Sequence, residues 1–327
     1  MRSPTRTRSS SRASIRRVEG PGARYRLRLS ARRHLRRFRL SEPVVKIAPS
    51  IGLVDAARWD ALAQAADDAR ERDYPFTRHA FLSALEDSGC VGEGTGWRPL
   101  HLLVEESERL VAAAPCYLKS NSQGEYVFDH AWADACLRAG IPYYPKLQLS
   151  IPFTPATGPR LLASAGPTGD PGRAALIGGL RALREQIGAS SIHATFLREE
   201  ERDAFAGAGF LMRIDQQFHW LDDSYGDYEG FLASLASRKR KAIRRERREA
   251  LAAGITVEWI TGSDLREEHW DAFHAFYQDT GSRKWGRPYL NRRFFSLIGE
   301  RMPERVLLVM ARREGRYVAG ALNFIGA

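Results

Sequence analysis

The sequence predicts an α/β protein with mixed sheets, built as two tandem domains of one kind, the second incomplete at its C-terminal end. A repeated pattern carries this prediction, because residues 100–118 and residues 305–325 both read as a strand, a tight polar turn and a second strand. An amphipathic helix precedes each copy. With 327 residues, 43% of them hydrophobic, the chain is long and apolar enough to bury two cores.

The first copy continues through a series of further elements. We expect its leading helix around Phe81 to Leu85, beginning after Thr77 as a cap. The strand pair is then followed by a short helix near 130–139 that Gly140 ends, a strand near 144–153, a helix near 174–187, a strand at 190–197 and two closing strands ending in QFHWL.

The second copy is shorter. Its helix contains Phe294, Phe295, Leu297 and Ile298, and the strand pair after it ends just before Ala327. The expected domains are a disordered Arg/Ser-rich leader at 1–43, a first domain at 44–221, and a region at 222–327 that holds a basic helix and the N-terminal part of the second domain. Either the sequence is a fragment, or its second domain is incomplete and inactive in isolation.

The positive charge of the chain is concentrated in the leader. The net charge is +11, but residues 1–40 hold fourteen arginines and a single acidic residue, Glu19. The other 287 residues carry 36 basic and 38 acidic groups, so the folded body is close to neutral. The leader fits a disordered extension or an over-extended start, and its composition also fits a transit peptide or a tether to an anionic surface.

Several protein classes are disfavoured by composition. The sequence has no apolar run of the ~18 residues needed to cross a bilayer, which favours a soluble protein. The cysteines, Cys90, Cys116 and Cys136, form no CxxC pair and indicate a reducing, cytoplasmic compartment. The eight histidines include no HExxH motif, so we expect no metal site and no tightly bound cofactor.

Seven long runs resemble one known family. They are SQGEYVFDHAWAD (122–134), YYPKLQ (143–148), PFTPATGPR (152–160), QFHW (217–220), SRKRKAIRRERR (237–248), DTGSRKWGRPYL (279–290) and VAGALNFIG (318–326). In this order they resemble the FemAB-like family of bacterial N-acyltransferases within the GNAT superfamily, over about 56–326. The resemblance implies tandem GNAT-like domains, and acyl-CoA or aminoacyl-tRNA as co-substrate. The superfamily's usual loop for the pyrophosphate of the acyl carrier has no good match here.

Transfer of this kind needs a base that takes a proton from the attacking amine. The candidates by location are Asp129, His130, Asp134 and His219. We favour Asp134, because it lies one helical turn after His130 and both can face one cleft. For each of them the alternative is a buried, hydrogen-bonded polar group.

The stretch 117–160 is dense in aromatic, charged and amide residues and is expected to form the wall of a substrate site. Arginine outnumbers lysine 44 to 6, so a lysine in such a stretch suggests a chemical need for this side chain. The alternatives are a surface ion for each lysine and a plug between domains for Trp285. The predicted substrate-binding residues are Tyr143, Tyr144, Lys146, Arg160, Lys284 and Trp285.

A helix at about 227–253 is expected to present a basic face that binds phosphate groups of a tRNA, a nucleotide-linked substrate or a coenzyme. The alternative is a solvated basic face on a linking helix. The predicted phosphate-binding residues are Arg238, Lys239, Lys241, Arg244, Arg245 and Arg248.

Three classes of function therefore remain open. The first is an N-acyltransferase that moves an acyl or aminoacyl group from acyl-CoA or aminoacyl-tRNA to the amine of a small molecule or a cell-wall precursor. The second is a ligand-binding protein that keeps the fold without transfer. The third is a nucleic-acid-binding protein that uses the leader and the basic helix, and the nearly neutral body argues against it.

Overall fold

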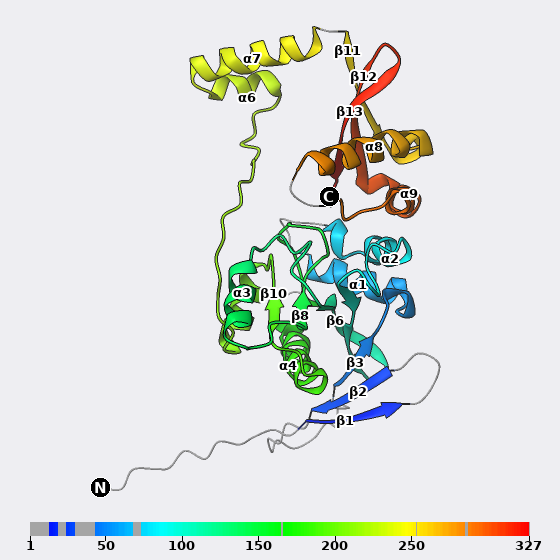
Figure 1. Cartoon of the computed structure of the whole chain (residues 1–327), viewed down its shortest axis with the longest axis vertical. Coiled ribbons are helices and arrows are strands. Elements are labelled where there is room, and N and C mark those ends of the chain that lie inside the picture. Colours follow the sequence, from blue (N-terminus) through cyan, green and yellow to red (C-terminus); the bar gives the residue numbers. More distant parts are fainter. Residues whose placement is uncertain are drawn as a thin grey trace, which may run out of the picture. The chain divides into compact units, whose positions relative to one another are not determined.

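The computed structural model describes residues 13–18, 24–29, 43–67, 73–164, 166–252, 254–284 and 287–326. Its elements are drawn in Figure 1. They fall into two compact units. The first unit runs to Phe210 and includes Tyr289–Met302, and the second contains Leu211–Pro288 and Pro303–Ile325. The domain limits and the tandem arrangement expected from the sequence stay predictions.

Two sheets organise the first unit, the first antiparallel and the second mixed. One has the strand order β1-β2-β3-β5-β6-β9, from β1 (Ala13–Val18), β2 (Arg24–Leu29), β3 (Val44–Ala48), β5 (His101–Glu106), β6 (Arg109–Ala114) and β9 (Leu162–Ala163). The other has the order β10-β8-β7-β4, from β4 (Trp97–Pro99), β7 (Cys116–Lys119), β8 (Lys146–Leu149) and β10 (Ile192–Ala194). Strands β8 and β10 pair in parallel and the other neighbours are antiparallel. The expectation of a mixed α/β fold is confirmed.

Helices complete the first unit: α1 (Ala56–Ala66), α2 (His79–Asp87), α3 (His130–Arg138), α4 (Asp170–Ile187), α5 (Glu199–Gly207) and α9 (Arg292–Arg301). Short 3-10 turns lie at Ile51–Leu53, Pro75–Thr77 and Gly166–Gly169. Helix α4 packs against β5 and β6, and its buried Leu176 and Leu180 join Leu102 and Val104 in the core. At Gly179 a Cβ would lie 2.8 Å from the Val45 side chain, so glycine allows this helix to approach the sheet closely.

The second unit is a three-stranded antiparallel sheet, β11-β12-β13, with helices. Its elements are α6 (Tyr228–Ser234), α7 (Ser237–Leu251), β11 (Ile255–Thr261), α8 (Glu267–Arg283), β12 (Val306–Arg313) and β13 (Arg316–Phe324), with 3-10 turns at Gly262–Asp264 and Pro303–Arg305. Helix α8 contacts β13 and buries Trp270 and Phe273. A Cβ at Gly320 would lie 2.6 Å from the sulfur of Met310, so glycine keeps β12 and β13 in contact there.

The helix followed by a strand pair, which the sequence predicts twice, is present at both predicted positions. It corresponds to α2 with β5 and β6, and to α9 with β12 and β13, although α9 is grouped with the first unit. Within the leader the structure describes only the backbone of β1 and β2, and the other leader residues lie outside the described ranges. The expected disorder of the leader stays a prediction.

Three details of the expected elements are wrong. The single helix at 227–253 is divided into α6 and α7, because Leu235 has an extended backbone with ψ of 150°. No strand forms between Leu211 and Asp227, so the two closing strands are not present in this described segment. Helix α2 begins after Arg78, while the Thr77 hydroxyl donates to the carbonyl of Tyr74.

The core of the first unit predicts a large effect of truncation at Leu180, which is fully buried. We expect Leu180→Ala to lower the free energy of unfolding by about 2–5 kcal/mol, because removal of its methyl groups leaves a cavity between α4 and the sheet. The matched control is Leu137→Ala on α3, where the side chain is 78% exposed and the change should stay within about 0.5 kcal/mol. Urea unfolding of both variants measures the difference, and equally small effects would contradict this packing.

Candidate functional site

Two buried lysines lie opposite each other where β7 ends and β8 begins. Lys119 and Lys146 are cross-strand partners, and both are fully buried. Like charges that face each other in a sheet are unfavourable, and burial of an ammonium group without a partner costs several kcal/mol. The pair therefore requires carboxylates close by.

The loop that follows β7 supplies these carboxylates. Lys146 Nζ lies 2.8 Å from Glu125 Oε2 and 2.5 Å from Asp129 Oδ2. It also donates to Ser122 Oγ at 3.3 Å. Lys119 Nζ lies 3.9 Å from Glu125 Oε1. Both carboxylate residues are buried, so the four charges form one internal cluster.

Aromatic side chains border the charges. Tyr143 donates its hydroxyl to Asp129 Oδ2 at 2.6 Å, and the Tyr144 hydroxyl lies 2.5 Å from Ser122 Oγ. Lys119 Nζ is 3.6 Å from the centre of the Trp97 ring and donates to the carbonyl of Gln123 at 2.9 Å. Both tyrosines are half-buried, so they connect the charges to the surface. The Lys146 cluster is defined here as Lys119, Ser122, Glu125, Asp129, Tyr143, Tyr144 and Lys146.

Backbone geometry explains how the loop reaches the lysines. Gly124 has φ of 76°, and a Cβ there would lie 2.6 Å from the Phe153 ring. Only glycine fits this turn without displacing the ring. Tyr126 follows with φ of 55°, an uncommon value for a residue with a side chain. The two turns fold the loop back so that Glu125 and Asp129 both face Lys146.

The surroundings shift the pKa values of Lys119, Glu125 and Asp129 in different directions. Burial lowers the pKa of Lys119 to about 7, against the opposing effect of Glu125. Burial also raises the pKa of Glu125, although the two lysines oppose this shift. Burial acts to raise the pKa of Asp129, but hydrogen bonds from Lys146, Ser122 and Tyr143 outweigh it and hold the value at about 2. The pKa of Tyr143 is raised by burial and by its bond to Asp129. Asp129 is therefore ionised, while Lys119 and Glu125 are suited to exchange protons.

Two oxygens of the Lys146 cluster have no hydrogen bond. Among the described residues, Glu125 Oε1 and Asp129 Oδ1 are buried acceptors without a hydrogen-bond partner. Most buried polar groups in folded proteins are paired, and unpaired ones require an explanation such as a functional role.

A comparison with known protein families gives a match over most of the chain. A family model described as FemAB-like, peptidoglycan biosynthesis/recognition, matches residues 50–327. The chain belongs to the FemAB-like family. The family resemblance of the sequence is thereby confirmed, and the match includes every member of the Lys146 cluster.

One solved structure is similar at low identity. The crystal structure of FemX has a TM-score of 0.38 and 14% sequence identity to this FemAB-like chain. The alignment covers 79% of this chain and 56% of the FemX chain, so the chain spans little more than half the length of FemX. No curated protein sequence matches the chain.

The predicted substrate residues of this FemAB-like chain are divided between several places. Tyr143, Tyr144 and Lys146 come together in the Lys146 cluster. Lys284 is exposed and follows the last residue of α8. Trp285 lies outside the described residues. Their roles stay predictions.

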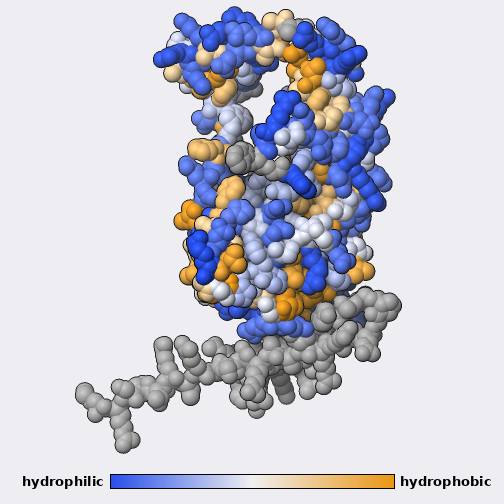
Figure 2. Space-filling model, viewed as in Figure 1, coloured by the Kyte–Doolittle hydropathy of each residue, from blue (hydrophilic) through white to orange (hydrophobic). Residues whose placement is uncertain are grey.

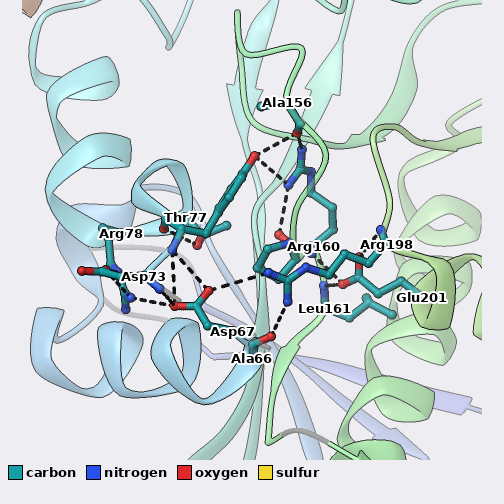
Figure 3. A network of polar contacts seen from close by, with 12 residues as sticks. Ala66, Asp67, Asp73, Thr77, Arg78, Ala156, Arg160, Leu161, Arg198 and Glu201 are labelled. Carbon is teal, nitrogen blue, oxygen red and sulfur yellow. Dashed lines mark hydrogen bonds and ion pairs between the residues drawn. The ribbon is translucent and has the colours of Figure 1, made fainter. Parts of the chain in front are cut away.

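Arg160 lies in a separate network that Figure 3 shows. It is fully buried, and its guanidinium donates to the carbonyls of Ala156 and Pro159 and to the Tyr74 hydroxyl. Its backbone N–H donates to Glu201 Oε1 at 2.6 Å. These contacts fit a structural role that holds the loop before β9, rather than contact with a substrate.

The predicted catalytic residues are divided between the two units. His130 and Asp134 are both exposed on α3, one turn apart as expected. His219 is exposed in the segment before α6, in the second unit, with Nε2 3.4 Å from Gln217 Oε1. Asp129, a candidate ranked below Asp134 from the sequence, is the one in contact with Lys146.

The predicted phosphate-binding residues all lie on α7, which buries none of its residues. This helix belongs to a strongly hydrophilic part of the surface (Figure 2). Arg244 forms an ion pair with Glu229, and Arg245 lies 3.6 Å from Glu249. The other predicted cations, which have no ion pair within the described part of the chain, are Arg238, Lys239, Lys241 and Arg248.

Sequence reasoning missed Glu125 and Ser122, and it gave Lys119 no specific role. Glu125 lies in the run 122–134, which carries the family resemblance, and this was the one sign of its importance. The spacing of residues along the sequence did not indicate that Glu125 contacts Lys146. Within the described ranges, no three His, Cys, Asp or Glu residues are grouped as a metal site would require. No described helix is long and apolar enough to cross a membrane.

The lowered pKa of Lys119 predicts a pH dependence of stability. The unfolded chain keeps this proton up to its ordinary pKa of 10.5, while the folded chain releases it near pH 7. The unfolded state thus binds more protons between these values, so this lysine's contribution to the free energy of unfolding rises with pH from about 7 to 10.5. Lys119→Met should remove this rise with pH. Compared with the unmodified chain, its free energy of unfolding should therefore be most favourable below pH 7. Urea unfolding at pH 6, 7.5 and 9 measures it.

The matched control for this prediction is Lys241→Met, which removes an exposed lysine from α7. Its difference from the unmodified chain should stay constant over the same pH range. A constant difference for Lys119→Met as well would contradict the lowered pKa.

Proposed function

We propose that the chain is an N-acyltransferase that moves an acyl or aminoacyl group onto the amine of a cell-wall-precursor-like acceptor. Membership of the FemAB-like family supports transfer of this class. The observation that carries the proposal is the Lys146 cluster, where two buried carboxylates each keep one oxygen without a hydrogen bond. An incoming amine is the kind of donor that would satisfy them.

The chemistry requires attack of a neutral amine on an ester or thioester carbonyl. The bound ammonium first gives one proton to the Lys146 cluster and becomes a neutral amine. A C–N bond then forms, the C–O or C–S bond to the carrier breaks, and the second proton that the nitrogen loses goes to the departing oxygen or sulfur of the carrier. Asp129 is ionised and is suited to bind and orient the acceptor as an ammonium ion. The half-buried Tyr143, in contact with Asp129, borders the same position.

The released proton has a route away from the reacting nitrogen. Polar atoms connect Asp129 to Lys146 at 2.5 Å and Lys146 to Glu125 at 2.8 Å. Glu125 has a raised pKa and lies 3.9 Å from Lys119, whose pKa of about 7 leaves part of its population neutral at neutral pH. In this proposal Asp129 contacts the substrate, while Glu125 and Lys119 receive the proton.

The proposal predicts that Asp129 is required for transfer. The assay incubates the chain with a nucleotide-linked muramoyl peptide and either acyl-CoA or aminoacyl-tRNA, and mass spectrometry detects the acceptor gaining one acyl group. We expect Asp129→Asn to lower kcat/KM by about 100-fold or more, as for removal of a group that takes part in proton transfer. Tyr143→Phe, which removes a single hydroxyl, should cause a smaller decrease with the fold intact.

The control for this assay is Asp203→Asn on α5, where the carboxylate is 66% exposed and pairs with Arg202. It should leave transfer unchanged. Loss of transfer in Asp134→Asn with full activity in Asp129→Asn would instead place the base on α3. Binding of the acceptor without any mass gain, with either donor, would favour a binding protein on this fold.

We also propose that α7 binds phosphate groups of the acyl donor. Its cations are exposed in a body that is otherwise nearly neutral, so they create a local positive field that attracts anions. Either coenzyme A or tRNA could supply the phosphates.

This proposal predicts that Lys241→Gln with Arg245→Gln weakens binding of one of these ligands while the helix persists, since glutamine has a similar helix propensity. For tRNA, the dependence of log Kd on log salt should flatten by about 0.7–0.9 for each phosphate that the helix no longer neutralises. The matched double variant, Arg98→Gln with Arg202→Gln, removes two exposed cations elsewhere. Equal affinities and equal salt slopes in all three proteins would show that α7 is only a solvated face.

A further inference from the structure

An aromatic hollow lies in the second unit, where the chain enters α6. Its volume is about 670 Å³. Four of its lining residues are aromatic: Trp220, Tyr225, Tyr228 and Phe231. The remaining lining residues are Asp222, Ser224, Gly226 and Asp227, so every residue of the lining comes from a stretch of twelve.

The rings are arranged around Phe231. Its ring centre lies 5.4 Å from Tyr225, 6.1 Å from Trp220 and 6.2 Å from Tyr228. Trp220 and Tyr225 are 6.2 Å apart with an angle of 35° between their planes. These spacings are those of interacting aromatic pairs, so the rings support one another around the hollow.

Local structure fixes this arrangement. Tyr228 and Phe231 are three residues apart on α6, which brings them to one side of the helix. Ser224 has φ of 59° and Gly226 has φ of 77°, and these two turns direct the chain so that Tyr225 meets Phe231. Ser224 carries a side chain in the left-handed region, a strain that is retained at this hollow.

The charges of the lining have one sign. Asp222 and Asp227 are both exposed carboxylates, and neither lysine nor arginine contributes to the lining. Each carboxylate accepts a backbone hydrogen bond through Oδ1: Asp227 from the Gly230 N–H at 2.7 Å and Asp222 from the Tyr225 N–H at 3.4 Å. The second oxygen of each carboxylate can therefore face a ligand.

Ring faces attract cations, and carboxylates beside them strengthen the attraction. The Tyr228 ring already holds a cation from outside the lining, since the Arg247 guanidinium of α7 lies 4.3 Å from its centre, so a ligand cation is left with the rings of Trp220, Tyr225 and Phe231. An anion would meet two negative charges, and a purely apolar ligand would leave both carboxylates beside apolar surface. Trp220, 67% exposed, offers a large ring surface for a cation to cover.

We propose that this hollow binds an alkylammonium group. The methyl or methylene groups of the ligand contact the rings of Trp220, Tyr225 and Phe231, and its positive charge is balanced by Asp222 and Asp227. A quaternary ammonium headgroup and a lysine-like primary amine share this chemistry.

The test is calorimetric titration of the full chain with choline, with N-acetyl-lysine methyl ester, and with 3,3-dimethylbutan-1-ol, the uncharged isostere of choline. We expect saturable binding of at least one cation and at least about tenfold weaker binding of the alcohol. A preference for choline identifies a quaternary headgroup as the ligand, and a preference for the lysine ester identifies a primary amine.

Variants connect the binding to the hollow. Trp220→Ala should weaken binding of the preferred cation by about fivefold or more, since it removes one ring face. Asp227→Asn should weaken it about two- to fivefold, and because asparagine is an equally good N-cap, α6 should persist in circular dichroism. The matched control is Trp259→Ala on β11, which removes another exposed indole of the same unit and should leave the affinity unchanged.

Three results would overturn the proposal. The first is equal affinity for choline, the lysine ester and the uncharged alcohol. The second is absence of saturable binding by both cations. The third is an equal loss of cation affinity in Trp220→Ala and Trp259→Ala, provided that both variants keep the melting temperature of the unmodified chain.

Discussion

Burial of the Lys146 ammonium group is the constraint on which the rest of the site depends. A fully buried cation is tolerated when opposite charges and hydrogen bonds replace its water, and here Glu125 and Asp129 do so at 2.8 and 2.5 Å. Lys119 is paired with Lys146 across β7 and β8, so a second buried lysine also needs carboxylates and hydrogen bonds close by. The loop after β7 must therefore return to the sheet, and the turns at Gly124 and Tyr126 are the local cost of bringing its carboxylates there.

A second buried polar network in the same unit shows what a structural role looks like. Glu201 accepts backbone N–H groups from Arg160 and Leu161 at 2.6 and 2.5 Å, so its carboxylate holds the chain where β9 begins. Asp67 likewise pairs with Arg78 at 2.9 Å (Figure 3). In these contacts the carboxylates bind neighbouring elements together. Both networks leave buried polar atoms without a hydrogen bond: Arg160 Nε in this network, and one oxygen each of Glu125 and Asp129 in the Lys146 cluster. The proposed function uses the two oxygens because they are acceptors, which an amine can satisfy, whereas Arg160 Nε is a donor.

The sequence predicted those elements and site residues whose signal is local. Apolar alternation in 305–325 predicts the β12 and β13 hairpin, and the dense stretch 143–146 pointed to two tyrosines and a lysine of the site. The segment 211–221 also alternates, but a strand needs a neighbour, and no described strand pairs with this segment. Glu125 contacts Lys146 over 21 positions and Asp129 does so over 17, separations that only the β7 and β8 register and the loop turns bridge. No local pattern records such a contact.

The two carboxylates of the Lys146 cluster share a lysine but differ in protonation, and this difference gives them different capacities. Asp129 receives hydrogen bonds from Lys146, Ser122 and Tyr143, which keep its pKa near 2, so at neutral pH it remains an anion able to hold an ammonium ion. Glu125 has fewer donors and a raised pKa, so a proton is taken up there more readily than at Asp129. Because burial raises the pKa of Glu125 and hydrogen bonds lower that of Asp129, the proposed mechanism assigns amine binding to Asp129 and proton storage to Glu125. The half-buried Tyr143 connects the anionic position to the surface, so the proposed mechanism has the acceptor approach Asp129 from the side of this tyrosine.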